Sequence, residues 1–281
     1  MNILVPMAGR GSRFLKESHN NPEYAKPKPT INVKGHPMVR WALASLPLTE
    51  KDQLIFLVLK EHVENFRIDE TLKKTFGDKI KIIVVDKLTE GAACTALLAK
   101  EYINNEEPLL VTDSDHYLDG AKIFNVLEKY KDLDGLIPVF YANNSKWSFS
   151  KIDEEEYVIE VAEKLKISRN ANIGAYYFGK GRDFVWAAEE MIEENDRTNE
   201  EFFMAPVYNY MIRRGKLIRL VRPRFAHGLG TPKDLEKFLV FLERGEVKYN
   251  FDNLDKIKEA QNKQEKSFSR DNFSEKEFDN K

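Results

Sequence analysis

The sequence has a single cysteine, Cys94, among its 281 residues. One cysteine can form no disulfide within the chain, and alone it cannot build a metal site. Its neighbours in the segment GAACTALLAK are mostly small or apolar. We therefore expect Cys94 to be a packed residue rather than a nucleophile.

Long apolar runs are missing as well. No stretch approaches the roughly 18 apolar residues that a membrane-spanning helix needs, and the apolar start at residues 1–6 has neither a basic flank nor a small-residue cleavage site. With 44 basic and 46 acidic residues, the net charge is −2, which gives no electrostatic reason to expect nucleic acid or a membrane as the main partner. We expect a cytoplasmic protein that binds neither.

What is present is an alternation of short apolar runs and helix-like segments. The expected strands are residues 3–5, 54–59, 80–85, 109–112 and 135–141. The helices expected between them are residues 38–46, 63–76, 92–103 and 121–131. This alternation predicts an α/β fold with a mostly parallel central sheet covered on both faces.

The pattern changes after Trp147. We expect a hairpin of residues 149–152 and 157–161, strands at 175–178 and 217–221, and helices at 184–194, 202–213 and 232–243. Thr231, just before a proline, is the expected N-cap of the last helix. We interpret residues 1–245 as one domain, with a first half over 1–145 and a second half with a small β subdomain over 146–245. Residues 246–281 are predicted to be a charged tail that is weakly helical or disordered.

The first informative motif is NILVPMAGRGSRF at residues 2–14. Gly9 and Gly11 follow a strand, and glycine lets backbone N–H groups approach a polyphosphate closely. Arg13 can add a guanidinium fork to the same oxygens. A tight turn below the sheet would explain the glycines alone. The loop is neither a dinucleotide fingerprint, because Phe14 replaces the third glycine, nor a Walker A loop, because Gly-Lys-Ser/Thr is missing.

Two further segments suit phosphate chemistry. In PKPTINVKGHPM, at residues 27–38, prolines on both sides fix the backbone of Lys28, which can hold an ammonium group over a reacting phosphate; a solvated surface lysine is the alternative. PLLVTDSDHY, at residues 108–117, ends an expected strand with Asp113 and Asp115. Carboxylate oxygens at the carboxyl edge of a sheet suit Mg²⁺, although an acidic turn would give the same pattern.

Taken together, G-x-G-x-R, P-K-P and V-x-G-x-P-M resemble the motifs of the sugar-phosphate nucleotidyltransferase family. The resemblance extends from residue 1 to about residue 243. It implies a Rossmann-like, glycosyltransferase A-type fold, with an NTP and a phosphorylated sugar or alcohol as substrates and Mg²⁺ as cofactor. The implied reaction transfers a nucleoside monophosphate and releases pyrophosphate, making an activated precursor of the kind used for surface polysaccharide. The oligomeric state stays open, with a homo-oligomer as one alternative.

The resemblance also implies roles for individual residues. The catalytic residues would be Arg13 and Lys28, and the NTP would be held by Ala8, Gly9, Gly11, Ser12, Glu90, Gly91 and Ala92. Metal would bind Asp115, with Asp113 beside it. VIEVAEK resembles a Glu-Lys pair and ANIGAYYF resembles N-x-G-x-Y-x-F, which would place the acceptor against Glu163, Lys164, Asn172 and Gly174.

The sequence departs from the family pattern in two places. Ala92 stands where the base-binding segment usually has threonine, so the nucleobase stays open, with a cytidylyltransferase for a non-hexose phosphate as one alternative. Gly228 stands where many members have a second metal-binding aspartate, which leaves Asp113 or His227 as candidates to replace it.

Two other functions fit parts of the sequence. A nucleotide-sugar-dependent glycosyltransferase could use Asp113 and Asp115 as a D-x-D motif, and a non-catalytic sensor could bind a nucleotide sugar without turnover. Arg13 and Lys28 favour the nucleotidyltransferase, because they would lie against a triphosphate that a glycosyltransferase does not bind.

Overall fold

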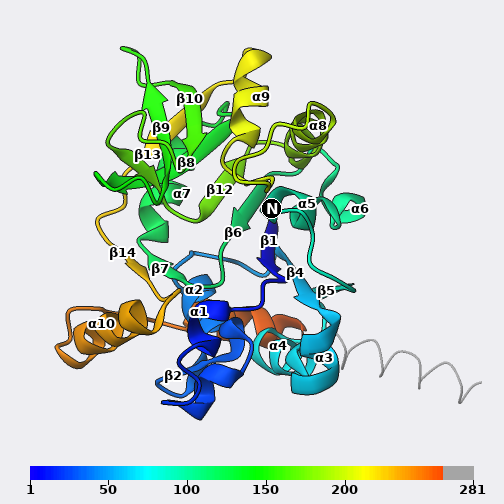
Figure 1. Ribbon diagram of the computed structural model, residues 1–281, viewed down its shortest axis with the longest axis vertical. Coiled ribbons are helices and arrows are strands. Elements are labelled where there is room, and N and C mark those ends of the chain that lie inside the picture. The colour runs from blue at the N-terminus through cyan, green and yellow to red at the C-terminus, as the bar shows by residue number, and fades with distance from the viewer. Residues whose placement is uncertain (262–281) are drawn as a thin grey trace, which may run out of the picture.

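The computed structural model describes residues 1–261 (Figure 1). Its main sheet has ten strands. Their order is β10 (Val158–Glu163), β9 (Ser148–Ile152), β11 (Asn170–Asn172), β8 (Gly135–Tyr141), β12 (Ala175–Phe178), β6 (Leu109–Thr112), β1 (Asn2–Met7), β4 (Gln53–Leu59) and β5 (Lys81–Val85), with β13 (Ile218–Val221) against β8. Strands β6, β1, β4 and β5 are mutually parallel, and β12 runs antiparallel between β6 and β8. The predicted α/β fold with a mostly parallel sheet is confirmed.

Helices cover both faces of this sheet. Side chains alternate between the faces along a strand, so Ile3 and Val5 of β1 enter one apolar cluster and Leu4 enters the other. The first cluster includes residues of α2 (Met38–Ala44), α4 (Ile68–Phe76), α7 (Gly120–Lys129) and α10 (Pro232–Glu243). The second includes residues of α5 (Ala92–Leu97), α6 (Lys100–Ile103), α8 (Gly181–Glu193) and α9 (Val207–Arg213). The protein therefore has three layers.

Three expected helices are shorter or interrupted. The segment expected over 63–76 is divided into α3 (Lys60–Phe66) and α4, because Arg67 between them adopts a left-handed conformation with φ 51°. The segment over 92–103 is divided into α5 and α6. Of the segment over 202–213, only α9 is helical, and Pro206 is its N-cap. Proline disfavours a helical conformation of the preceding residue, which explains the late start.

Three short strand pairings complete the fold. The expected hairpin forms between β9 and β10, and the backbone N–H of Asp153 donates to the carbonyl of Tyr157 across its turn at 2.9 Å. Strand β2 (Asn32–Val33) pairs with β3 (His36–Pro37) after the Lys28 segment. The sequence did not predict β7 (His116–Leu118), which pairs with β14 (Ala226–Gly228). This last ladder brings the chain near residue 228 to the end of β6.

Residues 246–261 pack onto the fold. Residues 252–261 are helical, and Val247, Phe251, Leu254 and Ile257 are buried in the first apolar cluster. The composition of this segment predicted little burial, but Leu254 and Ile257 lie three positions apart and so share one face of its helical part. Residues 262–281, the rest of the expected tail, lie outside the described residues. Within residues 1–261, no helix is long and apolar enough to cross a membrane.

Candidate active site

The loop after β1 presents backbone N–H groups without partners. The N–H groups of Gly9, Arg10 and Gly11 donate to no other group within residues 1–261. Gly11 is left-handed, with φ 64°, and a Cβ there would lie 3.2 Å from the Cβ of Lys28, so glycine is favoured at this position. Successive free N–H groups form a concavity suited to an anion. This is the arrangement expected of a phosphate-binding loop.

Arg13 lies in α1 (Ser12–Leu15), directly after this loop. Its side chain is exposed and has no carboxylate partner within the described part of the chain. Its positive charge acts on Lys28. Arg13 and Lys28 therefore place two cationic groups beside the glycine loop.

Lys28 and Asp115 form a close ion pair. Lys28 begins a short 3-10 helix, η2 (Lys28–Thr30), and its Nζ donates to Oδ2 of Asp115 at 2.6 Å. Burial alone would raise the pKa of Asp115, but the charges of Lys28 and His116 hold that pKa well below its usual range. Burial alone would lower the pKa of Lys28, but the charge of Asp115 outweighs it and raises that pKa. Both groups are thus charged at neutral pH.

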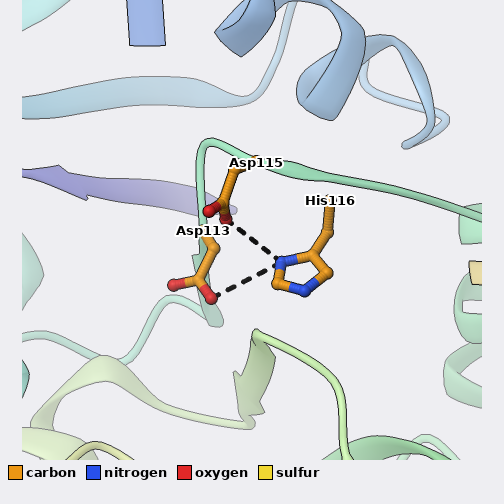
Figure 2. Close-up of side chains that lie close together, drawn as sticks. All are labelled: Asp113, Asp115 and His116. Atoms are coloured by element: carbon orange, nitrogen blue, oxygen red, sulfur yellow. Dashed lines mark ion pairs between the residues drawn. The ribbon is translucent and has the colours of Figure 1, made fainter. Parts of the chain in front are cut away.

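Asp113, Asp115 and His116 converge at the carboxyl end of β6, as Figure 2 shows. Nδ1 of His116 lies 3.3 Å from Oδ1 of Asp115 and 3.6 Å from Oδ2 of Asp113. Desolvation in this cluster and the nearby charge of Asp115 raise the pKa of the half-exposed Asp113 carboxyl. Two carboxylates this close repel each other, and a divalent cation would relieve the repulsion. The residues therefore fit a divalent cation.

Two glycines make room for the carboxylates. The backbone N–H of Asp113 donates to the carbonyl of Gly174 at 2.7 Å, and a Cβ on Gly174 would lie 1.8 Å from Oδ2 of Asp113. A Cβ on Gly230 would lie 2.5 Å from Oδ2 of Asp115. Gly174, which the sequence placed in the acceptor pocket, thus lies directly against the acidic cluster.

The expected base-binding segment packs against the second half of the chain. Gly91 has φ 137°, and a Cβ there would lie 2.3 Å from the carbonyl oxygen of Phe202. The N–H of Phe202 donates to the carbonyl of Glu90 at 2.8 Å, and the N–H of Ala93 donates to the carbonyl of Phe202 at 3.1 Å. Ala93 shares an apolar cluster with Ala8 of the glycine loop. The structure thus gives Gly91 a packing role that the sequence did not reveal.

The expected acceptor residues lie along β10 and β11. Glu163 pairs with Ser148 across the hairpin, and burial raises the pKa of its carboxyl. The Nζ of Lys164 lies 4.4 Å from the ring centre of Phe203. Asn172 accepts from Ser150 Oγ at 2.7 Å, while its Nδ2 is buried with no hydrogen-bond partner in the described residues. An unpaired buried donor of this kind suits a ligand.

The sequence reasoning did not select His116 or Tyr176. Burial is the main cause that raises the pKa of the Tyr176 phenol, and the charges of Asp113 and Glu163 raise it further. Tyr176 is therefore electrostatically coupled to both the acidic cluster and the acceptor strand. It occupies the tyrosine position of N-x-G-x-Y-x-F, so this motif could have identified it. The only signal for His116 was its place next to the D-x-D pattern.

Gly228 and His227 differ in their surroundings. Gly228 pairs with His116 across β14 and β7, and a Cβ there would meet nothing within 4 Å. The His227 ring packs against Phe225, Phe238 and Phe241 at centroid distances of 5.8, 5.7 and 5.2 Å. His116 is thus the histidine that joins Asp113 and Asp115.

The fold and the site define a class of protein. An α/β sheet with a glycine loop, a half-buried lysine and two carboxylates at one edge is suited to binding a polyphosphate together with a cation. Residues 8–244 match the family model described as nucleotidyl transferase. The match covers most of the chain, and the chain belongs to the nucleotidyl transferase family, as its motifs predicted.

Solved structures share the fold. A nucleoside-diphosphate-sugar pyrophosphorylase from Vibrio cholerae RC9 superposes with a TM-score of 0.73 at 24% identity, covering 85% of this chain and 99% of that one. A putative glucose-1-phosphate thymidylyltransferase from Bacillus anthracis superposes with a TM-score of 0.69 at 18% identity, covering 90% of this chain and 99% of that one. An inositol-1-phosphate CTP transferase from T. maritima superposes with a TM-score of 0.65 at 14% identity, covering 92% of this chain and 96% of that one. No curated protein matches the chain in sequence.

Proposed function

We propose that this nucleotidyltransferase moves a nucleoside monophosphate from an NTP to a phosphorylated sugar or alcohol, with Mg²⁺, and releases pyrophosphate. The observation that carries the proposal is the 2.6 Å contact between Lys28 and Asp115. It joins the segment beside the glycine loop to the acidic cluster. A triphosphate held by the loop would therefore meet both a lysine and the carboxylates that suit a cation.

The proposed reaction is an in-line displacement. A phosphate oxygen of the acceptor forms a bond to the α-phosphorus of the NTP, and the bond to the pyrophosphate oxygen breaks. The free N–H groups of Gly9, Arg10 and Gly11 would hold the departing phosphates, and Arg13 and Lys28 would neutralise their charge. Mg²⁺ bound by Asp113 and Asp115 would supply further positive charge. No covalent enzyme intermediate is required, since catalysis rests on positioning and electrostatics.

The remaining predicted residues divide into two groups in this proposal. Ala8, Ser12, Glu90, Gly91 and Ala92 lie on the nucleotide side. Glu163, Lys164, Asn172 and Gly174 lie on the acceptor side, and the buried Nδ2 of Asn172 is a donor that an acceptor oxygen could satisfy. The product would be an activated precursor, for which surface polysaccharide synthesis in the cytoplasm is the proposed use. CTP is one candidate donor, because a solved structure of this fold is named an inositol-1-phosphate CTP transferase.

A substrate panel tests the proposal. The purified protein is incubated with Mg²⁺, each of CTP, UTP, dTTP, GTP and ATP, and a set of sugar and alcohol phosphates, and pyrophosphate release is measured. Release that needs one NTP, one acceptor and the metal supports the proposal. A parallel incubation with nucleotide sugars tests the glycosyltransferase alternative, which hydrolysis or sugar transfer there, with no pyrophosphate from any NTP, would indicate. Nucleotide binding without any turnover would indicate a sensor.

A further inference from the structure

A cavity of about 360 Å³ opens beside the acidic cluster. His116 and Gly228 line it at the cluster, and β8, the loop after β8, and the chain between β13 and β14 form its other walls. Tyr141 and Trp147 provide aromatic surface. The cavity therefore extends from the proposed reaction centre into the second half of the protein.

The charges along this cavity are predominantly positive. Its charged lining residues, apart from His116, are Lys146, Arg222, Arg224 and Asp234. Arg224 is already paired with Asp119, which lies outside the cavity lining, at 2.6 Å. Asp234 accepts from the Thr231 hydroxyl at 2.6 Å and remains the one negative charge among these lining residues. Lys146 and Arg222 have no carboxylate partner within residues 1–261.

These two cations lie against aromatic rings. Nζ of Lys146 is 4.5 Å from the ring centre of Trp147, and Cζ of Arg222 is 4.0 Å from that of Tyr141. Such contacts orient a cation without neutralising its charge. The cavity thus combines flat apolar walls with two uncompensated positive charges.

Arg222 is too far from the acidic cluster to share one phosphate with it. Nη2 of Arg222 donates to Oδ1 of Asn170 at 3.3 Å, whereas Gly174 touches Asp113. Gly174 lies four positions after Asn170, which corresponds to roughly 13 Å at about 3.3 Å per extended residue. With the Arg222 guanidinium held at Asn170, a phosphate that attacks beside Lys28 and Asp115 would not contact it.

We propose that the acceptor carries a second acidic group, remote from its reacting phosphate, and that Lys146 and Arg222 bind this group. The inference rests on the proposed function. The second group is a carboxylate or a further phosphate, both of which a guanidinium binds through paired hydrogen bonds. The body of the acceptor lies against Trp147 and Tyr141. An acceptor with a cationic head is disfavoured.

Matched pairs of acceptors test this inference. Pyrophosphate release is measured with glucose 1-phosphate against glucuronic acid 1-phosphate, and with glycerol 3-phosphate against 3-phosphoglycerate, for the carboxylate. Glucose 1-phosphate against glucose 1,6-bisphosphate tests the phosphate. The acidic member of at least one pair is expected to have a kcat/KM about tenfold higher or more, the size of one charge-assisted contact. Equal rates, or a preference for the less acidic members, would overturn the inference while leaving the proposed function intact.

Substitutions locate the effect. Arg222→Gln and, separately, Lys146→Gln are each expected to reduce the preference for the acidic member about tenfold through KM. Lys129→Gln is the matched control, since Lys129 also lies over a tyrosine ring, 4.9 Å from that of Tyr130, but does not line the cavity. It should leave the preference unchanged. A preference that survives both cavity substitutions would show that the acidic group binds elsewhere.

If no pair releases pyrophosphate, that result counts against the proposed function for these acceptors. The inference is then tested by measuring how tightly each acceptor binds. The same pairs are titrated by intrinsic fluorescence, to which Trp147 contributes from the cavity wall. The acidic member is expected to bind at least about tenfold more tightly, with a response that Trp147→Phe removes and Arg222→Gln weakens. Equal affinity of both members, or no response to either, would overturn the inference.

Discussion

Lys28 connects the glycine loop to the acidic cluster, so its side chain gives the sharpest test of catalysis. We expect Lys28→Ala to lower kcat on the order of 100-fold to 1000-fold, because the transition state loses a positioned positive charge. Steady-state pyrophosphate release measures the effect. Lys26→Ala is the control: Lys26 is two residues away, exposed, and pairs with Glu23 at 2.7 Å. A Lys28 variant that folds and turns over normally would remove this residue from the mechanism.

Gly174 allows a test of the metal site that spares the fold. The methyl group of Gly174→Ala would lie 1.8 Å from Oδ2, 2.5 Å from Cγ and 3.1 Å from Cβ of Asp113, so the whole Asp113 side chain has to turn away, while no backbone atom is among these contacts. We expect the Mg²⁺ concentration for half-maximal activity to rise about tenfold or more, as when supporting contacts of a metal site are lost. Titration of activity with Mg²⁺ measures this.

The control for that substitution is Gly228→Ala, because a Cβ at Gly228 meets nothing within 4 Å. Its Mg²⁺ dependence should match that of the unaltered protein. An unchanged Mg²⁺ requirement in Gly174→Ala would show that the position of Asp113 does not control metal binding.

At the scale of single residues, local motifs predicted part of the candidate site. The glycine loop, Lys28 and the two aspartates are each recognisable from a few adjacent residues. The contact between Gly174 and Asp113 joins segments about 60 positions apart, and the place of His116 depends on the pairing of β7 with β14. Such contacts depend on tertiary packing, which adjacent residues do not encode.

Among the elements, the start of α5 packs tightly against the backbone of another segment. A Cβ on Gly91 would lie 2.3 Å from a backbone oxygen and 2.6 Å from a backbone nitrogen of Phe202, and φ is 137°. Backbone atoms cannot move aside as a flexible side chain can, so we expect Gly91→Ala to lower the free energy of unfolding by about 2–4 kcal/mol. Urea unfolding measures this. The same assay on Gly228→Ala should show a change within about 0.5 kcal/mol, and equal values for the two variants would contradict the prediction.

The helical segment at 252–261 gives a second test at the scale of elements. Leu254 is 1% exposed, and we expect Leu254→Ala to reduce the free energy of unfolding by about 2–5 kcal/mol through lost burial and the cavity that remains. Lys256→Ala, at an exposed position of the same segment, should change it by less than about 0.5 kcal/mol. If Leu254→Ala were as stable as the control, this segment would not be part of the fold in solution.

The elements differ in how far the sequence predicts them. The strands β1, β4 and β6 are continuous apolar runs because the sheet buries both of their faces, and such runs are easily recognised in a sequence. The interruption at Arg67 has no glycine or proline to announce it. The late start of α9 could have been predicted from Pro206, since proline restricts the residue before it.

On the scale of the whole molecule, the site lies where the two halves of the sheet meet. The parallel strands β1 and β6 supply the glycine loop and the aspartates. The antiparallel strand β12 follows Gly174, whose carbonyl accepts from Asp113. A nucleotide on one side and an acceptor on the other would therefore meet at one seam of a single continuous sheet, which favours direct transfer between two bound anions.

The stability of the whole molecule should depend on pH through His62, which is 5% exposed. Burial lowers the pKa of His62 although the charge of Glu61 opposes it. The folded pKa is thus below the unfolded value of about 6.5, so the unfolded state binds more protons as the pH falls through that range. His62 therefore destabilises the folded protein in acid. His62→Gln removes this penalty, so we expect its destabilisation relative to the unaltered protein to shrink between about pH 7.5 and about pH 5.5.

Urea unfolding of both proteins at the two pH values measures the difference between their free energies of unfolding. Burial lowers the pKa of His116 but Asp115 and Asp113 raise it overall, and the Asp113 pKa is also raised. His116 and Asp113 therefore stabilise the folded protein as the pH falls, because the folded state binds more protons at these two groups than the unfolded state does. They are present in both proteins, so their contribution cancels in the comparison. A difference that stayed constant with pH would mean that folding leaves the pKa of His62 unchanged, and one that grew in acid would mean that folding raises it.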